Sequence, residues 1–314
     1  AVGPHSGRAM KCCRLLCGAF VAFLALLLAL PPETIVCYAY SDDCSPMESL
    51  GEDRPQLALP LPLVVQMFRN FLARRARGSG YVLVHIAPSV QDQSDVIPPG
   101  SVQAFHAPGT FRLVYAEPQA EVLESWRMHL LAHGFKQGDA TFAQTAICDH
   151  DSEAVTLYRP AQRLRLDHLS LVAPHVLVEQ ASLNATRLLD WLPRLARELA
   201  RLGPERLASY LENETVRCTT PASLLREAGV SPGAVAHFGT DLQGQDALDM
   251  VEGFLALEGF RPDVVTFEYR GHHRYDPEAV SSLERIVRTL VARGYDIHRP
   301  VDDIFAVATP PREK

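Results

Sequence analysis

The stretch FRLVYAEPQAEVLESWRMHLLAHG, residues 111–134, contains the pattern that decides the fold. Its first six residues are mostly apolar or aromatic, as expected for a strand buried inside a parallel sheet. The strand ends at Glu117-Pro118, and an amphipathic helix is predicted over Glu121–His133, closed by Gly134. A strand, an acidic turn and a helix together form one unit of an α/β fold.

The same alternation extends along most of the chain. Further strands are predicted over residues 81–86, 140–148, 154–158, 234–240, 264–269, 295–298 and 304–308, the last two as an antiparallel pair. Helices are predicted over residues 61–77, 187–211 (as two helices, because Pro204 interrupts the segment), 220–228, 242–253 and 277–293. The sequence therefore predicts a mostly parallel sheet with helices on both faces.

The N-terminal segment has the pattern of a targeting sequence. Residues 15–30 carry no charge and are mostly Leu, Ala, Phe and Val, and Lys11 and Arg14 precede them. A membrane anchor, a signal peptide cleaved near Ala39 and a buried soluble helix are all compatible with this run. We expect four regions: a cytosolic tail (1–14), a signal-anchor or signal peptide (15–38), a stalk (39–60), and an α/β domain (61–314) with a helical insertion near 187–214.

Two observations agree with a domain that faces the secretory lumen, in a single-pass type II or secreted protein. The basic flank favours a cytosolic N-terminus. Two of the three asparagines, Asn184 and Asn213, stand in glycosylation sequons. Cys37, Cys44, Cys148 and Cys218 form an even set that could pair in an oxidising compartment, with buried free thiols as the alternative.

Composition excludes some classes of function. The apolar fraction of 47% and the charged fraction of 21% are those of a globular protein. A net charge of −7 gives no reason to expect a nucleic-acid partner. No cysteine or histidine group has zinc-site spacing, and the adjacent His272 and His273 lack further ligands, so no metal is expected.

Acidic side chains stand at the ends of several predicted strands, namely Glu117, Asp149, Asp241 and Glu268. Ligands of parallel α/β sheets bind at the carboxyl ends of the strands, where a carboxylate can accept hydrogen bonds from ribose hydroxyls. The alternative role for each acid is to cap the following helix or turn.

The order of these segments resembles the FkbM-type family of S-adenosylmethionine-dependent methyltransferases, over most of residues 81–307. The similar stretches are LVYAEPQ (113–119), TAICDHDSEAVTLY (145–158), TTPASLL (219–225), DLQG (241–244) and RPDVVTFEY (261–269). The resemblance implies a Rossmann-like class I methyltransferase fold and S-adenosylmethionine as the cofactor.

The resemblance also assigns roles to individual residues. Glu117 would bind the ribose hydroxyls of the cofactor, Asp149 would lie near its adenine, and Asp241 would face the methyl-transfer site. His85 and Ala87 occupy the family's cofactor loop, in the stretch HIAPSVQD (85–92).

Several loop residues depart from the family pattern. His85 stands in place of an acid, Ala87 and Gln91 in place of glycines, and Gln243 in place of a glutamate near the reacting centre. Four histidines are candidate bases, because a histidine titrates near neutral pH: His85, His237, His272 and His273.

Three functions are therefore compatible with the sequence. The first is an O-methyltransferase acting on a hydroxyl of a glycan, glycolipid or related small molecule in the secretory pathway. The second is an inactive methyltransferase-fold protein that binds partners at the membrane, as the altered glycine loop suggests. The third is an unrelated nucleotide-sugar enzyme, which would also use acids at strand ends.

Overall fold

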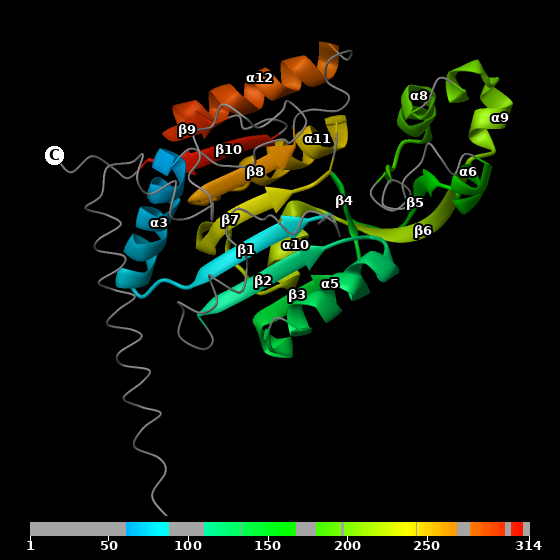
Figure 1. Ribbon diagram of the computed structural model, residues 1–314. Helices are drawn as coiled ribbons and strands as arrows, with labels where there is room; N and C mark the ends of the chain where they lie inside the picture. The colour runs from blue at the N-terminus through cyan, green and yellow to red at the C-terminus, as the bar shows by residue number, and fades with distance from the viewer. Residues whose placement is uncertain are drawn as a thin grey trace, which may run out of the picture. The chain divides into compact units, whose positions relative to one another are not determined.

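A seven-stranded sheet organises the part of the chain described by the computed structural model (Figure 1). The described residues are 61–87, 110–132, 134–167, 180–195, 198–242, 244–268, 277–298 and 303–309. The strand order is β3-β2-β1-β7-β8-β10-β9. The bounds are β1 (Tyr81–Ile86), β2 (Phe111–Ala116), β3 (Ala140–Ala143), β7 (Val235–Thr240), β8 (Val264–Glu268), β9 (Tyr295–His298) and β10 (Asp303–Ala308).

Most of this sheet is parallel, and β1 lies at the point where the strand order reverses. β1 pairs in parallel with β2 on one side, Leu83 opposite Leu113, and with β7 on the other, Leu83 opposite His237. β10 is antiparallel to both β8 and β9. The carboxyl ends of β1, β2 and β7 therefore meet at one edge of the sheet.

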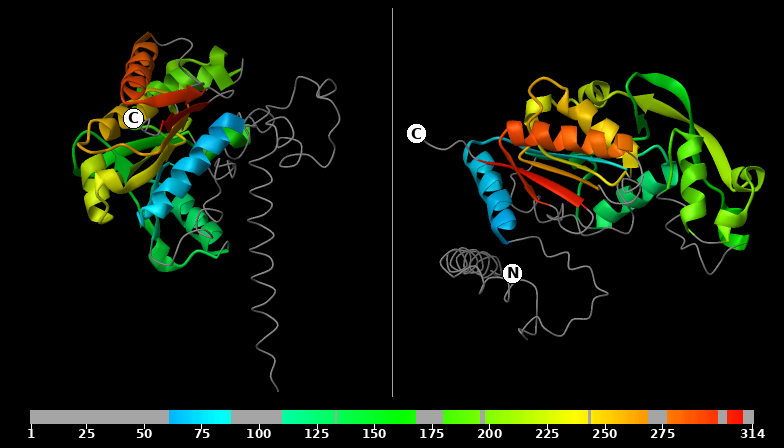
Figure 2. Two further views of the ribbon diagram at one scale, coloured as in Figure 1. Left: turned by 90° about the vertical axis from the view of Figure 1, so that its left-hand side faces the viewer. Right: turned by 90° about the horizontal axis from the view of Figure 1, so that it is seen from above.

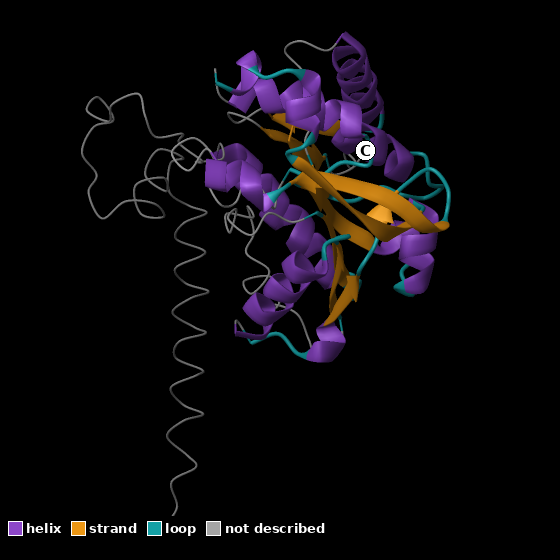
Figure 3. Cartoon of the chain, turned by 90° about the vertical axis from the view of Figure 1, so that its right-hand side faces the viewer, coloured by secondary structure: helices purple, strands orange, loops and turns teal. Residues whose placement is uncertain are grey.

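Helices cover both faces of the sheet, as Figure 3 shows. One core contains buried residues of α10 (Pro221–Glu227), α11 (Gly244–Leu255) and α12 (Pro277–Ala292), packed on side chains such as Val84 and Phe238. The other contains residues of α3 (Leu61–Ala76) and α5 (Ala120–Ala132), packed on Leu83, Leu113 and Tyr115. Alternate residues of β1 enter opposite cores, as the pleat requires. The expected α/β architecture is confirmed and is compatible with a Rossmann-like fold.

A second, three-stranded sheet leads into a small helical extension. The strands of this sheet are β4 (Ala146–Ile147), β5 (Ser152–Pro160) and β6 (Leu211–Thr219), in the order β4-β6-β5. We call the segment from β5 to β6 (residues 152–219), with the helices between them, the arm. The helices of the arm are α6 (Gln162–Asp167), α8 (Ala185–Leu195) and α9 (Pro204–Ala208), with a 3-10 turn at Leu199–Arg201. They enclose a core of their own, formed by Leu164, Leu192, Leu199, Leu207 and Tyr210. Figure 2 shows the arm and α3 at opposite ends of the large sheet.

Two segments differ from the sequence prediction. The strand expected over 140–148 is two strands, because β3 pairs with β2 in the large sheet whereas β4 pairs with β6 in the small one. The helical segment expected over 187–211 ends at α9, and β6 follows it as a nine-residue strand that pairs with β5. The composition of β6 (LENETVRCT) is polar and does not indicate a strand, and its partner residues in β5 lie between 51 (Pro160 to Leu211) and 66 (Ser152 to Cys218) positions earlier in the chain.

Polar side chains of α3 fix this helix to the sheet. Arg74 Nε donates to Asp263 Oδ2 over 2.8 Å, and the Arg74 side chain is only 9% exposed. The amide of Asn70 donates to the carbonyl oxygen of Ala308 over 2.8 Å. These contacts attach the first described helix to the segments that precede β8 and end β10.

Within the described residues, no helix is long and apolar enough to cross a membrane. The apolar run at 15–30 and the stalk predicted over 39–60 lie outside the described residues, as do Gln91, Gln243, His272 and His273.

Candidate functional site

The candidate site lies at the carboxyl ends of β1, β2 and β7, where the strand order reverses. Four of the residues singled out from the sequence belong to these strand ends: His85 and Ala87 from β1, Glu117 after β2, and Asp241 after β7. In open parallel sheets this position forms the ligand-binding crevice, because the connections leaving neighbouring strands diverge to opposite faces.

His85 and Asp241 form a polar pair across the ends of β1 and β7. His85 Nε2 lies 3.3 Å from Asp241 Oδ2, with side-chain exposures of 6% and 27%. The backbone N–H of Asp241 donates to the carbonyl oxygen of Ile86, which holds the end of β7 beside the end of β1. On its other side, the His85 ring stacks on Tyr115 with centroids 5.9 Å apart. An imidazole and a carboxylate, two side-chain types that commonly act in proton transfer, thus lie together at the carboxyl edge of the sheet.

A glycine on β7 leaves space for the hydroxyl of Thr266, next to His85. A Cβ at Gly239 would lie 2.9 Å from Thr266 Oγ1 and 3.7 Å from the His85 ring. Thr266 Oγ1 in turn lies 3.3 Å from His237 Nε2. Gly239 and Thr266 thus line the site beside His85. Neither residue could be recognised from the sequence, because its place beside His85 depends on the register between β7 and β8.

Ala87 keeps the backbone conformation that glycine would adopt at its position. Its φ is +48°, in the left-handed region, and it is the one non-glycine residue of the described chain with a positive φ. Its N–H donates to the carbonyl oxygen of Ala116 over 2.8 Å, which joins the turn after β1 to the end of β2. Left-handed backbone costs an L-residue about 1 kcal/mol or more, and such strained residues cluster at functional sites.

Glu117 is buried at the end of β2, with 4% of its surface exposed. One carboxylate oxygen accepts the backbone N–H of Gln119 over 2.8 Å. Burial raises the pKa of Glu117 to about 7, and the nearby carboxylates Glu121 and Glu214 contribute in the same direction. Near neutral pH this carboxyl group is therefore divided between its acid and its carboxylate forms.

The arm is attached on two sides of the site. Arg159 of β5 donates to the Gln119 side chain over 3.2 Å and forms an ion pair with Glu121 in the first turn of α5. On the other side, Ser182 Oγ donates to Asp246 Oδ2 over 2.7 Å, and Arg187 of α8 forms an ion pair with the same aspartate. Asp246 is in the first turn of α11, five residues after Asp241. The arm thus borders the site at the exits of both β2 and β7.

Asp149 belongs to a different neighbourhood from the other predicted residues. It follows β4, its side chain is 90% exposed, and it contacts His150 Nδ1 over 2.5 Å. This hydrogen bond lowers the pKa of Asp149 below its usual value. Asp151, two residues later, has a structural role, since its carboxylate accepts from Thr220 N (2.7 Å) and Ser223 Oγ (2.6 Å) at the start of α10.

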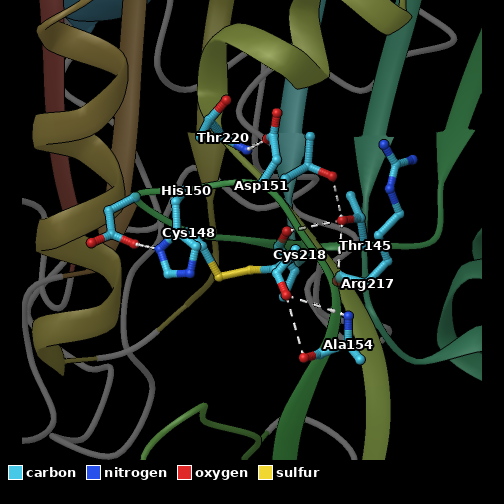
Figure 4. Close-up of a disulfide and its surroundings, with 12 residues drawn as sticks. Thr145, Cys148, His150, Asp151, Ala154, Arg217, Cys218 and Thr220 are labelled. Atoms are coloured by element: carbon cyan, nitrogen blue, oxygen red, sulfur yellow. Dashed lines mark hydrogen bonds and ion pairs between the residues drawn. A yellow bond between two sulfur atoms is a disulfide. The ribbon is translucent and has the colours of Figure 1, made fainter.

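A disulfide fixes the small sheet next to this turn. Cys148 and Cys218 are bonded, with their Cα atoms 5.8 Å apart (Figure 4). The hydroxyls of Thr145 and Thr219 lie 2.7 Å apart beside it. For this pair the structure selects the disulfide over free thiols. Cys37 and Cys44 lie outside the described residues.

In the described part of the chain, no three His, Cys, Asp or Glu side chains are grouped so that they could hold a metal ion.

Among known proteins, similarity is found only to solved structures, and it is distant. No protein-family model matches the chain. No curated protein matches it either. A crystal structure of a protein from Corynebacterium glutamicum, determined as a structural-genomics target, aligns with a TM-score of 0.34 and 9% identity. The alignment covers 79% of this chain and 82% of that one. A likeness at this TM-score carries no argument about fold or function, so the functional assignment rests on the site itself.

Proposed function

We propose that this chain is an S-adenosylmethionine-dependent O-methyltransferase that acts on a hydroxyl group of a glycan, glycolipid or related small molecule. The strand order is the observation that carries the proposal. If the seven strands of the large sheet are renumbered 1 to 7 as they follow along the chain, their order in the sheet is 3-2-1-4-5-7-6. The seventh strand, β10, is antiparallel to its neighbours. The dinucleotide-binding order is 3-2-1-4-5-6. The inserted antiparallel strand agrees with the class I methyltransferase fold that the sequence resemblance implies.

The residues at the strand ends fit this cofactor. A buried carboxylate after the second strand, Glu117, is suited to accept hydrogen bonds from both hydroxyls of a ribose. Ala87 holds the left-handed turn that lets a backbone approach a ligand closely, although it carries a Cβ. Neither residue requires a metal ion for its role.

His85 and Asp241 would serve the acceptor. When bound, S-adenosylmethionine supplies an electrophilic methyl group. The contribution of the protein is to position the acceptor hydroxyl and to take up the proton that it releases. The 3.3 Å contact between the imidazole and the carboxylate provides a proton acceptor at the edge of the sheet. The arm, attached at α11 beside Asp241, would supply the acceptor-binding surface.

Calorimetric titration of S-adenosylmethionine into the full chain tests the cofactor site. We expect saturable binding that Glu117→Gln weakens on the order of 10- to 100-fold, because a charge-assisted hydrogen bond is lost. Glu124→Gln is the matched control: Glu124 is on the exposed side of α5, paired with Arg127, and should bind as the wild type does. No binding by a folded chain would refute the proposal.

Transfer of a labelled methyl group to a panel of glycans and glycolipids tests the reaction. Asp241→Asn should slow transfer roughly 100-fold or more while leaving cofactor affinity within a few-fold, since general-base effects have this size. Equal rates for Asp241→Asn and the wild type would exclude Asp241 from the proton transfer.

A binding protein without catalytic activity is the second candidate. Two residues favour this candidate. His85 stands where the FkbM-type family has an acid, and Ala87 carries a Cβ where that family has a glycine. This candidate predicts a folded chain that does not bind S-adenosylmethionine. Binding of a sugar nucleotide in the same titration would instead support a nucleotide-sugar enzyme.

A further inference from the structure

The arm carries both glycosylation sequons of the chain. The chain has three asparagines, and Asn184 and Asn213 are each followed two residues later by a threonine, whereas Asn70 is not. Asn184 and Asn213 are exposed. Asn70 is 8% exposed, with its amide hydrogen-bonded to the carbonyl oxygen of Ala308. The two asparagines in sequons are thus the accessible ones.

The geometry of Asn184 leaves its amide nitrogen suited to modification. Asn184 precedes α8, and its Oδ1 accepts the backbone N–H of Thr186 over 3.0 Å. This hydrogen bond uses the oxygen of the amide, whereas glycosylation replaces a hydrogen on the nitrogen. A glycan at Asn184 is therefore compatible with the turn that starts α8.

Asn213 occupies an exposed position on β6. It stands opposite Tyr158 of β5, and Thr215 two residues later is exposed as well. Alternate residues of a strand project from the same face, so the asparagine and the threonine of this sequon share one side of the ladder. Tyr158 also forms an isolated bridge with Ser182, which brings the segment before Asn184 to the same ladder.

The disulfide supplies an independent observation. Cys218 is the last residue but one of the strand that carries Asn213, and it is bonded to Cys148 of the neighbouring segment. Disulfides form and persist in oxidising compartments, which include the lumen where N-glycosylation takes place. The β5–β6 ladder and the segment bridged to it at Ser182 therefore combine a disulfide with two exposed sequons.

We propose that Asn184 and Asn213 each carry an N-linked glycan. The co-reactant is an oligosaccharide joined through a diphosphate to a lipid. A bond forms between the asparagine Nδ2 and C1 of the first sugar, the bond from C1 to the diphosphate oxygen breaks, Nδ2 loses one proton, and the lipid diphosphate leaves. Both glycans lie on the arm, at the opposite end of the large sheet from α3 (Figures 1 and 2). The proposal does not depend on the methyltransferase assignment.

Expression of the full chain in eukaryotic cells, with its own N-terminal segment, tests the proposal. Peptide-N-glycosidase F should increase the gel mobility to that of the Asn184→Gln/Asn213→Gln double variant made in the same cells. Asn184→Gln and Asn213→Gln should each lose about half of the mobility shift that the glycosidase causes in the wild type. The double variant should show no shift. Thr186→Ser and Thr215→Ser keep both sequons and control for changes in folding.

Mass spectrometry after glycosidase treatment gives the second readout. We expect aspartate at positions 184 and 213 and unmodified asparagine at position 70. Unmodified asparagine at both sequons, with no change in mobility, would overturn the proposal. Conversion at one position alone would overturn it for the other.

Discussion

Replacement of Glu117 by Gln should stabilise the protein at neutral pH while it weakens ligand binding. The carboxyl group is 4% exposed, and burial raises its pKa from 4.5 to about 7. One pKa unit corresponds to about 1.4 kcal/mol, so a rise from 4.5 to about 7 corresponds to roughly 3 kcal/mol. This free energy is the cost of holding an ionised carboxylate in the folded site. The glutamine keeps an oxygen that can accept the N–H of Gln119.

The sign of the pH dependence follows from linkage. The folded state holds the proton of Glu117 up to about pH 7, whereas the unfolded chain releases it near pH 4.5. Wild-type stability therefore falls, relative to the variant, as the pH rises from about 4.5 through 7. The glutamine does not titrate. The difference in unfolding free energy between Glu117→Gln and the wild type should thus be smallest below pH 4.5 and reach its full value above pH 7.

Urea denaturation of both proteins at several pH values between 4.5 and 8 measures this difference. Glu124→Gln is the control, because the hydrogen bond from Arg127 lowers the pKa of that exposed carboxyl, the opposite direction. A difference between Glu117→Gln and the wild type that stays constant over this pH range would refute the reasoning. If Glu117→Gln has the larger unfolding free energy at neutral pH, the glutamate lowers stability in the wild type, as expected of a residue that serves binding.

Three further predictions concern the frame of the site. Ala87→Gly should leave the unfolding free energy close to the wild-type value, because relief of the left-handed strain offsets the entropy of glycine. Ala116→Gly in β2 relieves no such strain and should lower the unfolding free energy by about 1 kcal/mol; equal losses for the two variants in urea denaturation would contradict this reading. Cys218→Ser opens a covalent loop of 70 residues and should cost roughly 4 kcal/mol, and a reductant should lower the wild type to the same midpoint. Arg74→Met leaves the half-buried Asp263 without its guanidinium partner and should lower the unfolding free energy by about 3 kcal/mol. Adding Asp263→Asn should restore part of this unfolding free energy, and no recovery would show that loss of the ion pair is not the cause.

The alternation of strands and helices could be predicted from the sequence because it depends on local patterns. The apolar runs of β1 and β2 and the helical spacing in α5 and α12 are visible within a few residues of each other. The same reasoning located Glu117 and Asp241, since each acid directly follows such a strand. The alternation of strands and helices also predicts a parallel sheet, and in a parallel sheet the carboxyl ends of the strands share one edge. Glu117 and Asp241 could therefore be placed at the same edge from the sequence.

The arm was harder to predict because its ladder is non-local. β6 is polar and pairs with a strand on the far side of α6 and α8, so no window of the sequence contains both partners. The separation of β3 from β4 has the same cause, since the two strands are three residues apart and belong to different sheets.

The sequence by itself thus determined the fold class, the candidate acids and the two sequons, because each depends on residue type and short-range spacing. Only the tertiary structure decided which candidates meet. It brought His85 to 3.3 Å from Asp241, showed that Ala87 adopts the left-handed conformation of a glycine, and joined Cys148 to Cys218. These contacts depend on strand register and on long-range pairing, in which one residue of slippage would turn every side chain to the opposite face.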